Sequence, residues 1–486
     1  RPKDGSDLPP RPPFMPIIGH LHLLLSSLIH KSFQKISSKY GPLLHLRIFN
    51  VPIVLVSSAS MAHEIFKTHD VNISSRGLTP IDESLFFGSS GFFSAPHGDY
   101  WKFMKKLMVT KLLGSQALER SKDARADELK HFYSNLLDKA MKKESVDIGK
   151  EAMKFANNSI CKMFLGKSIS EEKGEAEKIR GLITEGIGMM KKTFLSAIFR
   201  RWFEKLGISI SLFKKEIMSV SRRFDELLER IVVEHEEKVD EHPRGSDMMD
   251  VLLEAYEDKN AEYKINRNHV KSLIMDLVGA GTDTSRQIIQ WTMAEMINNP
   301  KILERLREEI DSVVGKTRLI QESDILNLPY LQAVVKEGLR LYPAFPVLIR
   351  LFRRGCKVKG FYIPKSTLLV VNSYAVMRDP NVWEDPDEFK PERFLGRSSR
   401  SGQVEDEVRE NVLKYLPFGG GRRACPGSNL AYIILGTAVG MMVQRFDWRI
   451  DGDKVNMEEA GGAMTLRMAH PLKCTPIPRT LNPLKF

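Results

Sequence analysis

Apolar residues recur at helical spacing over most of this chain. Between residues 61 and 340 they commonly lie three and four positions apart, which predicts a largely helical stretch. One helix is expected to begin at the Asn299-Pro300 pair and to stop at Gly315. The pattern predicts another helix over 329–341, which opens at a proline.

Shorter apolar runs predict a minor β component. The runs at 43–58, 368–372, 446–450 and 463–468 are rich in branched and apolar residues, as strands are. A last long helix is expected from just after Pro426 to about residue 444. No repeat, low-complexity tract or composition break divides the chain, so the pattern predicts one mainly helical domain with a small β part.

The N-terminal segment has a different character. Residues 1–20 contain six prolines, which predicts a stiff, extended segment instead of a helix. We expect this segment to be a hinge that followed a membrane anchor or targeting piece, now removed. The single folded domain is expected to span residues 21–486.

Composition narrows the class of protein. Of the 486 residues, 42% are hydrophobic and 28% charged, which excludes a disordered chain. The net charge of +12 suits a membrane surface or an acidic protein partner, although ordinary solubility charge is an alternative. No zinc-finger, RNP or P-loop pattern supports nucleic-acid binding. The four cysteines are too widely spaced for a disulfide scaffold or a CxxC zinc site.

One cysteine lies in a glycine-rich loop, Pro-Phe-Gly-Gly-Gly-Arg-Arg-Ala-Cys425-Pro-Gly, just before a predicted helix. The helix start and the two arginines favour a thiolate at Cys425. A thiolate in this setting suits either a nucleophile, which would need a nearby base, or an axial ligand of haem iron. The alternative is that Cys425 has no chemical role and is only a small, buried apolar residue.

The loop matches a known signature. It resembles the haem-binding pattern FxxGxRxCxG of cytochromes P450 at Phe418, Gly421, Arg423, Cys425 and Gly427. The resemblance implies the mainly α P450 fold, with haem b between a long central helix and the cysteine loop. It also implies that Cys425 is the only protein ligand of the iron, and that electrons come from NADPH through a separate reductase.

Further motifs of the family appear along the chain in the order that the family shows. Glu337 and Arg340 resemble the ExxR pair, and one helical turn separates them. Pro391-Glu-Arg393-Phe is similar to the family's PERF motif. By resemblance, Arg393 joins Glu337 and Arg340 in a structural triad that serves folding and haem retention.

A polar segment interrupts an apolar helix at Ala-Gly281-Thr-Asp283-Thr284-Ser. Gly281 costs helix stability, roughly 1 kcal/mol relative to alanine. A kinked core helix with hydroxyls bonded to its own carbonyls is one explanation. The segment also resembles the family's [AG]GxDT[TS] motif, which implies a local opening of the helix beside the iron. Thr284 and Asp283 would then deliver protons to dioxygen, O2, in a mostly dry pocket.

Haem propionates need cationic partners. Trp101 and Lys105 resemble the family's WxxxR pair, with lysine in place of arginine, so the charge is kept but not the bidentate fork. Arg350 occupies the place where plant members carry a propionate arginine, and Arg423 is the third candidate. For Trp101 alone, an ordinary core position is the alternative.

Apolar stretches predict a hydrophobic small-molecule substrate. By resemblance, these stretches are residues 86–94, 275–280, 344–349 and 464–466, although each suits an ordinary core. Residues 190–213 alternate basic clusters with aromatic residues, as in a helix pair on anionic lipid; a surface segment packed on the protein is the alternative. The full-length protein is expected on the cytosolic face of the endoplasmic reticulum membrane.

In style the chain resembles plant microsomal, A-type members of the family. Its Lys-Tyr-Leu-Pro-Phe-Gly-Gly-Gly loop and Asn-Pro-Leu-Lys-Phe tail are similar to a mustard-family branch that oxidises triterpene alcohols of the thalianol kind. The expected activity is therefore insertion of one oxygen atom into a triterpenoid. The alternatives are a flavonoid-modifying P450, an isomerase or dehydratase that needs no reductase, a haem sensor and a cysteine hydrolase.

Overall fold

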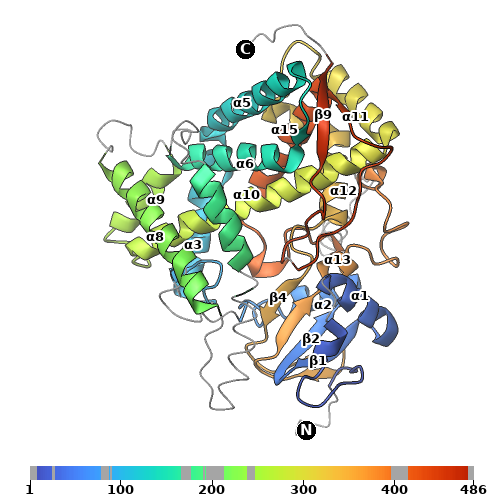
Figure 1. Cartoon of the computed structure of the whole chain (residues 1–486). Coiled ribbons are helices and arrows are strands. Elements are labelled where there is room, and N and C mark those ends of the chain that lie inside the picture. Colours follow the sequence, from blue (N-terminus) through green and yellow to red (C-terminus); the bar gives the residue numbers. More distant parts are fainter. Residues whose placement is uncertain are drawn as a thin grey trace, which may run out of the picture.

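The chain folds around one long helix, α10 (Arg267–Asn298), which crosses the molecule. In the computed structural model, most helices lie around α10, and a small sheet with α1 and α2 lies toward the N-terminus (Figure 1). The structure describes residues 8–24, 28–77, 87, 90–165, 177–189, 192, 213–237, 247–395, 414–462 and 464–479.

Shorter helices precede and follow α10 along the chain, and residues 177–189 are helical as well. They are α1 (Ile29–Tyr40), α2 (Ala59–Thr68), α3 (Asp99–Leu107), α4 (Ser115–Arg120), α5 (Lys122–Met141), α6 (Ile148–Leu165), α8 (Lys214–Glu236), α9 (Met248–Glu257), α11 (Pro300–Val313), α12 (Pro329–Leu341), α13 (Ser373–Val376) and α15 (Ser428–Arg445). Brief helical turns are η1 (Leu21–Leu24), the π-helical η3 (Met108–Leu112), η5 (Glu322–Asn327), η6 (Pro391–Phe394) and η7 (Gly421–Arg423).

In the part of the chain that the structure describes, the strands form three small sheets. They are β1 (Leu43–Ile48), β2 (Val51–Val56), β3 (Val146–Asp147), β4 (Leu348–Leu351), β5 (Cys356–Val358), β6 (Phe361–Ile363), β7 (Leu368–Val371), β8 (Phe446–Arg449) and β9 (Lys473–Pro478). The largest sheet has the order β1-β2-β7-β4, in which β2 and β7 are parallel and the other pairs antiparallel. The others are β3-β9-β8 and β5-β6.

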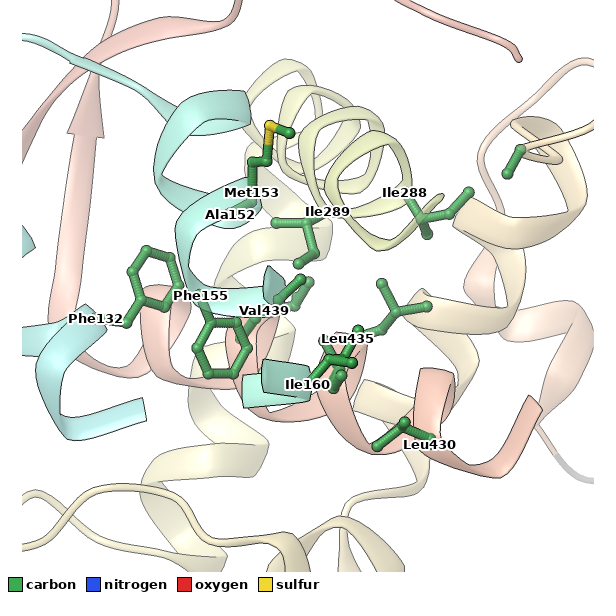
Figure 2. Packing of buried hydrophobic residues seen from close by; sticks show 14 of the residues in the cluster. Phe132, Ala152, Met153, Phe155, Ile160, Ile288, Ile289, Leu430, Leu435 and Val439 are labelled. Atoms are coloured by element: carbon green, nitrogen blue, oxygen red, sulfur yellow. The ribbon is translucent and has the colours of Figure 1, made fainter. Parts of the chain in front are cut away.

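The main core lies where α10 meets α6 and α15. Figure 2 shows Ile160 of α6, Ile289 of α10, and Leu435 and Val439 of α15 gathered between these helices. All four side chains are buried. Three helices that are far apart in the sequence therefore share one apolar interior, which fixes α10 against α15, the helix that follows the cysteine loop.

Most predicted elements are confirmed. The helices α11 and α12 begin at their prolines, α15 follows Pro426, and strands β1, β2, β7 and β8 lie in the predicted runs. The strand expected at 463–468 is wrong: its described residues form bends and one isolated bridge between Glu459 and Met468. Residues 8–20 form no helix, as predicted, and they pack on β1, where Pro10 O accepts the His45 N–H at 2.8 Å.

A buried ion-pair cluster holds the irregular chain between α13 and the cysteine loop. Arg340 donates twice to Glu337, at 2.7 and 2.8 Å, and Arg393 Nε donates to the same carboxylate at 2.9 Å. Arg340 also donates to the carbonyls of Met377 and Pro386, at 2.8 and 2.7 Å. The side chains of Glu337 and Arg340 are fully buried, so each charge depends on the other.

Candidate functional site

The cysteine loop has a backbone shape that favours glycine at two positions. Gly419 and Gly421 adopt φ angles of +72° and +65°, which other residues rarely adopt. A Cβ at Gly421 would also lie 2.1 Å from Asp70 Oδ1. The loop closes where the Cys425 N–H donates to Phe418 O at 2.9 Å, and α15 begins just after Gly427.

Cys425 lies in a positive environment. It is the exposed one among the four cysteines, yet protein atoms crowd it enough for desolvation to raise the pKa of its thiol. The Gly427 N–H, Arg76 and Lys105 oppose that rise because each favours the thiolate. Cys161 and Cys474 are buried, and burial raises the pKa of each to about 12, in Cys161 against the effect of Arg180.

Three arginines gather near this thiol, and two acids, Asp70 and Asp276, lie close to them. Burial and mutual repulsion lower the pKa of Arg76 well below its usual value, with Arg350 and Arg423 as the repelling neighbours. Burial also lowers the pKa values of Arg350 and Arg423 to about 10. Of the nearby acids, Asp70 pairs with Arg422 at 2.8 Å. The cluster therefore carries excess positive charge in a buried place, which favours an anionic partner.

Unpaired N–H groups mark the place for that partner. Arg76 Nε, Trp101 Nε1 and Arg423 Nη1 are buried and have no hydrogen-bond partner among the described residues. The Arg423 guanidinium lies 4.3 Å from the centre of the Trp101 ring, so two of the donors are neighbours. Cations and N–H donors beside a cysteine fit the two carboxylates of haem and its iron, so the residues present suit that group.

Other predicted propionate partners have contacts of their own. Lys105 Nζ donates to the carbonyls of Arg422 and Ala424, and it lies 5.4 Å from the Trp101 ring centre. Lys105 thus ties α3 to the cysteine loop. Arg350 Nη1 donates to Ile349 O at 2.8 Å.

Helix α10 is continuous through the polar segment, so the local opening expected there is not present. The Thr284 hydroxyl donates to Ala280 O at 2.6 Å, one turn back in the helix. A Cβ at Gly281 would lie 2.4 Å from Ile160 Cδ1. The glycine therefore allows α6 and α10 to approach closely, a packing role that the sequence motif does not reveal.

Asp283 points toward the segment around residue 465. Arg467 Nη2 lies 3.3 Å from Asp283 Oδ2, and Thr465 Oγ1 lies 3.4 Å from the same oxygen. Gln287 Nε2 donates to Oδ1 at 3.3 Å, and Arg286 Nη1 lies 3.6 Å from Oδ1. The side chain is buried, and each of these groups can donate to it.

The described parts of the four substrate stretches meet in pairs. The Phe93 N–H donates to Asp276 Oδ2 at 3.0 Å, and the Leu466 N–H donates to Ala344 O at 3.0 Å. Burial raises the pKa of Asp276 to about 6, against the effect of the Phe93 N–H. Most of the predicted lipid-facing stretch at 190–213 lies outside the described residues.

Sequence reasoning missed Arg76. It lies in irregular chain between Ser75, which forms an isolated bridge with Leu351, and Gly77, and it belongs to none of the motifs. Its guanidinium stacks on Phe93, 3.7 Å from the ring centre, and its charge acts on Cys425 and Arg423. The sequence offered one sign of this role, a basic residue within a short stretch of small residues.

Fold and site together define a haem-thiolate protein, and the comparison with family models agrees. The model described as Cytochrome P450 matches residues 9–475, so the chain belongs to the cytochrome P450 family. Its mainly α fold with a minor β part is the fold of that family.

Relatives place the chain more narrowly. Cytochrome P450 705A22 of Arabidopsis thaliana is 67% identical over 99% of this chain and 93% of its own. Cytochrome P450 705A5 of the same plant is 67% identical over 98% and 92%. A solved zebra fish cytochrome P450 with abiraterone superposes with a TM-score of 0.77 over 93% of this chain and 99% of its own, at 24% identity. The chain is a plant P450 of the 705A branch.

Membership establishes the class of enzyme. The chain is a P450 monooxygenase, which works with cysteine-ligated haem, O2 and electrons that a reductase passes on from NADPH. Among the described residues, no helix combines the length and apolar character needed to cross a membrane.

Proposed function

We propose that Cys425 is the axial thiolate ligand of the haem iron and that four side chains hold the propionates. These are Arg76, Trp101, Arg350 and Arg423. The observation that carries the proposal is the set of three buried N–H donors without partners beside a cysteine in a positive environment. Lys105 stabilises the loop through its carbonyls and adds charge near the same place.

The test of the ligand compares cysteines. Cys425→Ala should abolish the strongly red-shifted CO band of the reduced protein, because a thiolate ligand gives that band. Cys356→Ala is the matched control, because Cys356 is partly exposed and distant in sequence from the loop. Loss of the band in Cys356→Ala and its survival in Cys425→Ala would show that the assignment is wrong.

When bound, haem with a thiolate ligand supplies the activation of O2, from which one atom enters the substrate and the other leaves as water. The Thr284 hydroxyl would donate the first proton that this chemistry requires. This hydroxyl must first turn from Ala280 O, its present acceptor at 2.6 Å. Asp283, the residue before Thr284, supplies Thr284 with further protons from the solvent side. Asp283 is buried, which limits its contact with bulk water, so these two side chains control proton delivery.

The substrate we propose is a triterpenoid. The paired apolar stretches around Phe93, Ala344 and Leu466 support a hydrophobic ligand. Screening plant triterpene alcohols with a supplied reductase tests the proposal. The expected product is heavier than its substrate by the mass of one oxygen atom. Turnover of no triterpene, with turnover of another class, would overturn it.

A flavonoid-type substrate is the second candidate, and one relative favours it. The soybean (Glycine max) protein named 3,9-dihydroxypterocarpan 6A-monooxygenase is 41% identical over 99% of this chain and 95% of its own. The same reductase assay with flavonoid and pterocarpan substrates separates the two candidates.

We also propose that the full-length enzyme acts on the cytosolic face of the endoplasmic reticulum membrane. Phe14, Met15 and Ile17 support this, since they expose 48%, 48% and 73% of their surface on one short segment. The net charge of +12 adds attraction to anionic lipid. Flotation with anionic vesicles should carry this chain, and Phe14→Glu with Ile17→Glu should weaken that binding.

A further inference from the structure

The Asp283 carboxylate faces a different part of the molecule from its neighbour Thr284. Successive residues of an α-helix point about 100° apart. Thr284 bonds within α10, whereas Asp283 contacts Thr465 and Arg467 on a segment that is distant in sequence. The acid proposed to supply protons is therefore bound to partners on another segment.

That segment is well anchored. The Ala460 N–H donates to Arg467 O, and the Ala469 N–H donates to Glu458 O, both at 2.8 Å. Trp291 Nε1 of α10 donates to Leu466 O at 3.2 Å. Main-chain bonds on both sides thus fix the position from which residue 467 reaches Asp283.

The Arg467 side chain lies between the buried Asp283 carboxylate and the solvent. Its side chain is 25% exposed, whereas that of Asp283 is 3% exposed. Arg467 Nε also donates to Thr465 Oγ1 at 3.0 Å, which orients both partners of the carboxylate. One partly exposed guanidinium therefore holds the buried acid and its buried hydroxyl partner together.

The contacts of Asp283 are long for a buried ion pair. The hydrogen bonds to it measure 3.3–3.4 Å, whereas those of the Glu337 cluster measure 2.7–2.9 Å. Typical N–H···O bonds are about 2.9–3.0 Å long and weaken as they lengthen. The same chain thus holds one carboxylate in a tight structural cluster and the other in a loose one.

We propose that Arg467 is a positioning residue: with Thr465, it holds Asp283 turned away from Thr284, and proton delivery requires this contact to open. The proposal rests on the proposed role of Asp283 as the proton supplier. The guanidinium keeps the acid in place between turnovers, and the long contacts allow its release. The released Asp283 carboxylate takes up a proton from water, passes it to the Thr284 hydroxyl as that hydroxyl gives up its own proton, and returns to Arg467 as a carboxylate.

The first experiment measures the solvent deuterium effect on product formed per NADPH consumed, in the haem-loaded enzyme with its reductase. Arg467→Gln should lower the effect toward one, because an untethered Asp283 reaches Thr284 more often. Arg467→Lys, which keeps the charge, should restore most of the wild-type value. An unchanged effect in Arg467→Gln would overturn the proposal, and so would a larger one, since Arg467 would then carry the proton.

Arg286→Gln is the matched control. It removes a positive charge 3.6 Å from the same carboxylate, but Arg286 belongs to α10 and cannot tether Asp283 to another segment. Its solvent deuterium effect should equal that of the wild type. An equal fall of the solvent deuterium effect in both variants would mean that positive charge near Asp283, and not a tether to another segment, determines the effect. The proposal would then fail.

Asp283→Asn separates this inference from the proposed function. That variant should enlarge the solvent deuterium effect and lower product per NADPH. If it changes neither quantity, the relay role of Asp283 fails, and the inference fails with it. If Asp283→Asn behaves as expected while Arg467→Gln matches the wild type, only the inference is wrong.

The second experiment needs no turnover. A double-mutant cycle of Asp283→Asn and Arg467→Gln in urea unfolding measures how strongly the pair is coupled. A releasable contact predicts a coupling of about fivefold in the unfolding equilibrium constant. A coupling of more than about a hundredfold, as for the loss of one partner from a buried structural pair, would show that the contact does not open.

Discussion

Gly281 offers the sharpest test of how the central helix is packed. Substitution by alanine adds one methyl group at a point where α6 and α10 touch. The new Cβ would lie 2.4 Å from Ile160 Cδ1, a distance that no pair of carbon atoms tolerates. Ile160 is only 3% exposed, so its side chain must shift within a filled core.

The same helix contains a control. A Cβ at Gly279 would meet no atom within 4 Å. Both substitutions replace glycine by alanine inside α10, and each gains up to about 1 kcal/mol of helix propensity. Overpacking at residue 281 costs about 1–3 kcal/mol in addition. The propensity gain cancels in the comparison, so Gly281→Ala should unfold more readily than Gly279→Ala by about 1–3 kcal/mol.

The assay is urea unfolding of the haem-bound protein, followed by far-UV circular dichroism, with equal slopes required for the comparison. Ile160→Val removes the one atom that clashes, at a cost of about 0.5–1.5 kcal/mol by itself. In that background the penalty at residue 281 should disappear, which gives a coupling of about 1 kcal/mol or more. Equal stability of the two alanine variants, or no relief by Ile160→Val, would refute the packing role.

Three further predictions concern protons, the partner and pH. Thr284→Ala should keep the CO spectrum but lower product per NADPH about tenfold or more; an unchanged ratio would exclude proton donation by Thr284. Lys106 and Lys111 are exposed and follow Lys105, which contacts the cysteine loop, so we expect them to steer an acidic reductase to that face. Lys106→Glu with Lys111→Glu should slow reductase-driven turnover several-fold at low salt, less so at high salt, and leave peroxide-driven turnover unchanged. Equal losses in both assays would instead indicate damage to the haem site. Burial raises the pKa of Asp276 to about 6, above its value in the unfolded chain, so the wild type should lose stability relative to Asp276→Asn as pH rises from about 4 to 6. Parallel stability curves for these two proteins would contradict that titration.

Features with a local cause were predictable from the sequence. Helix α12 begins at Pro329 and ends at Leu341, as its proline and apolar spacing indicate. The Glu337–Arg340 pair was predictable because one helical turn brings the two side chains together. In such cases the residues that decide the structure are close together in the sequence.

Features that depend on distant segments were not predictable in this way. The stretch at 463–468 reads as a strand, yet Thr465 and Arg467 turn toward Asp283 instead of pairing in a ladder. Arg76 gains its role only because its segment lies near Arg350 and Arg423, which come from other parts of the chain. Apolar spacing carries no information on such meetings.

Arg340 has a consequence for how the chain can vary. Besides its carboxylate partner, it binds the main-chain carbonyls of Met377, Pro386 and Glu388, at 2.8, 2.7 and 3.1 Å. Every residue type carries a carbonyl, so exchanges of side chains between these points leave the acceptors in place. A deleted or inserted residue would shift the acceptors along the chain and strand a buried guanidinium. Arg340 therefore restricts the number of residues in 379–385, whereas it makes no demand on the side chains that are exposed there, such as Pro380 and Glu384.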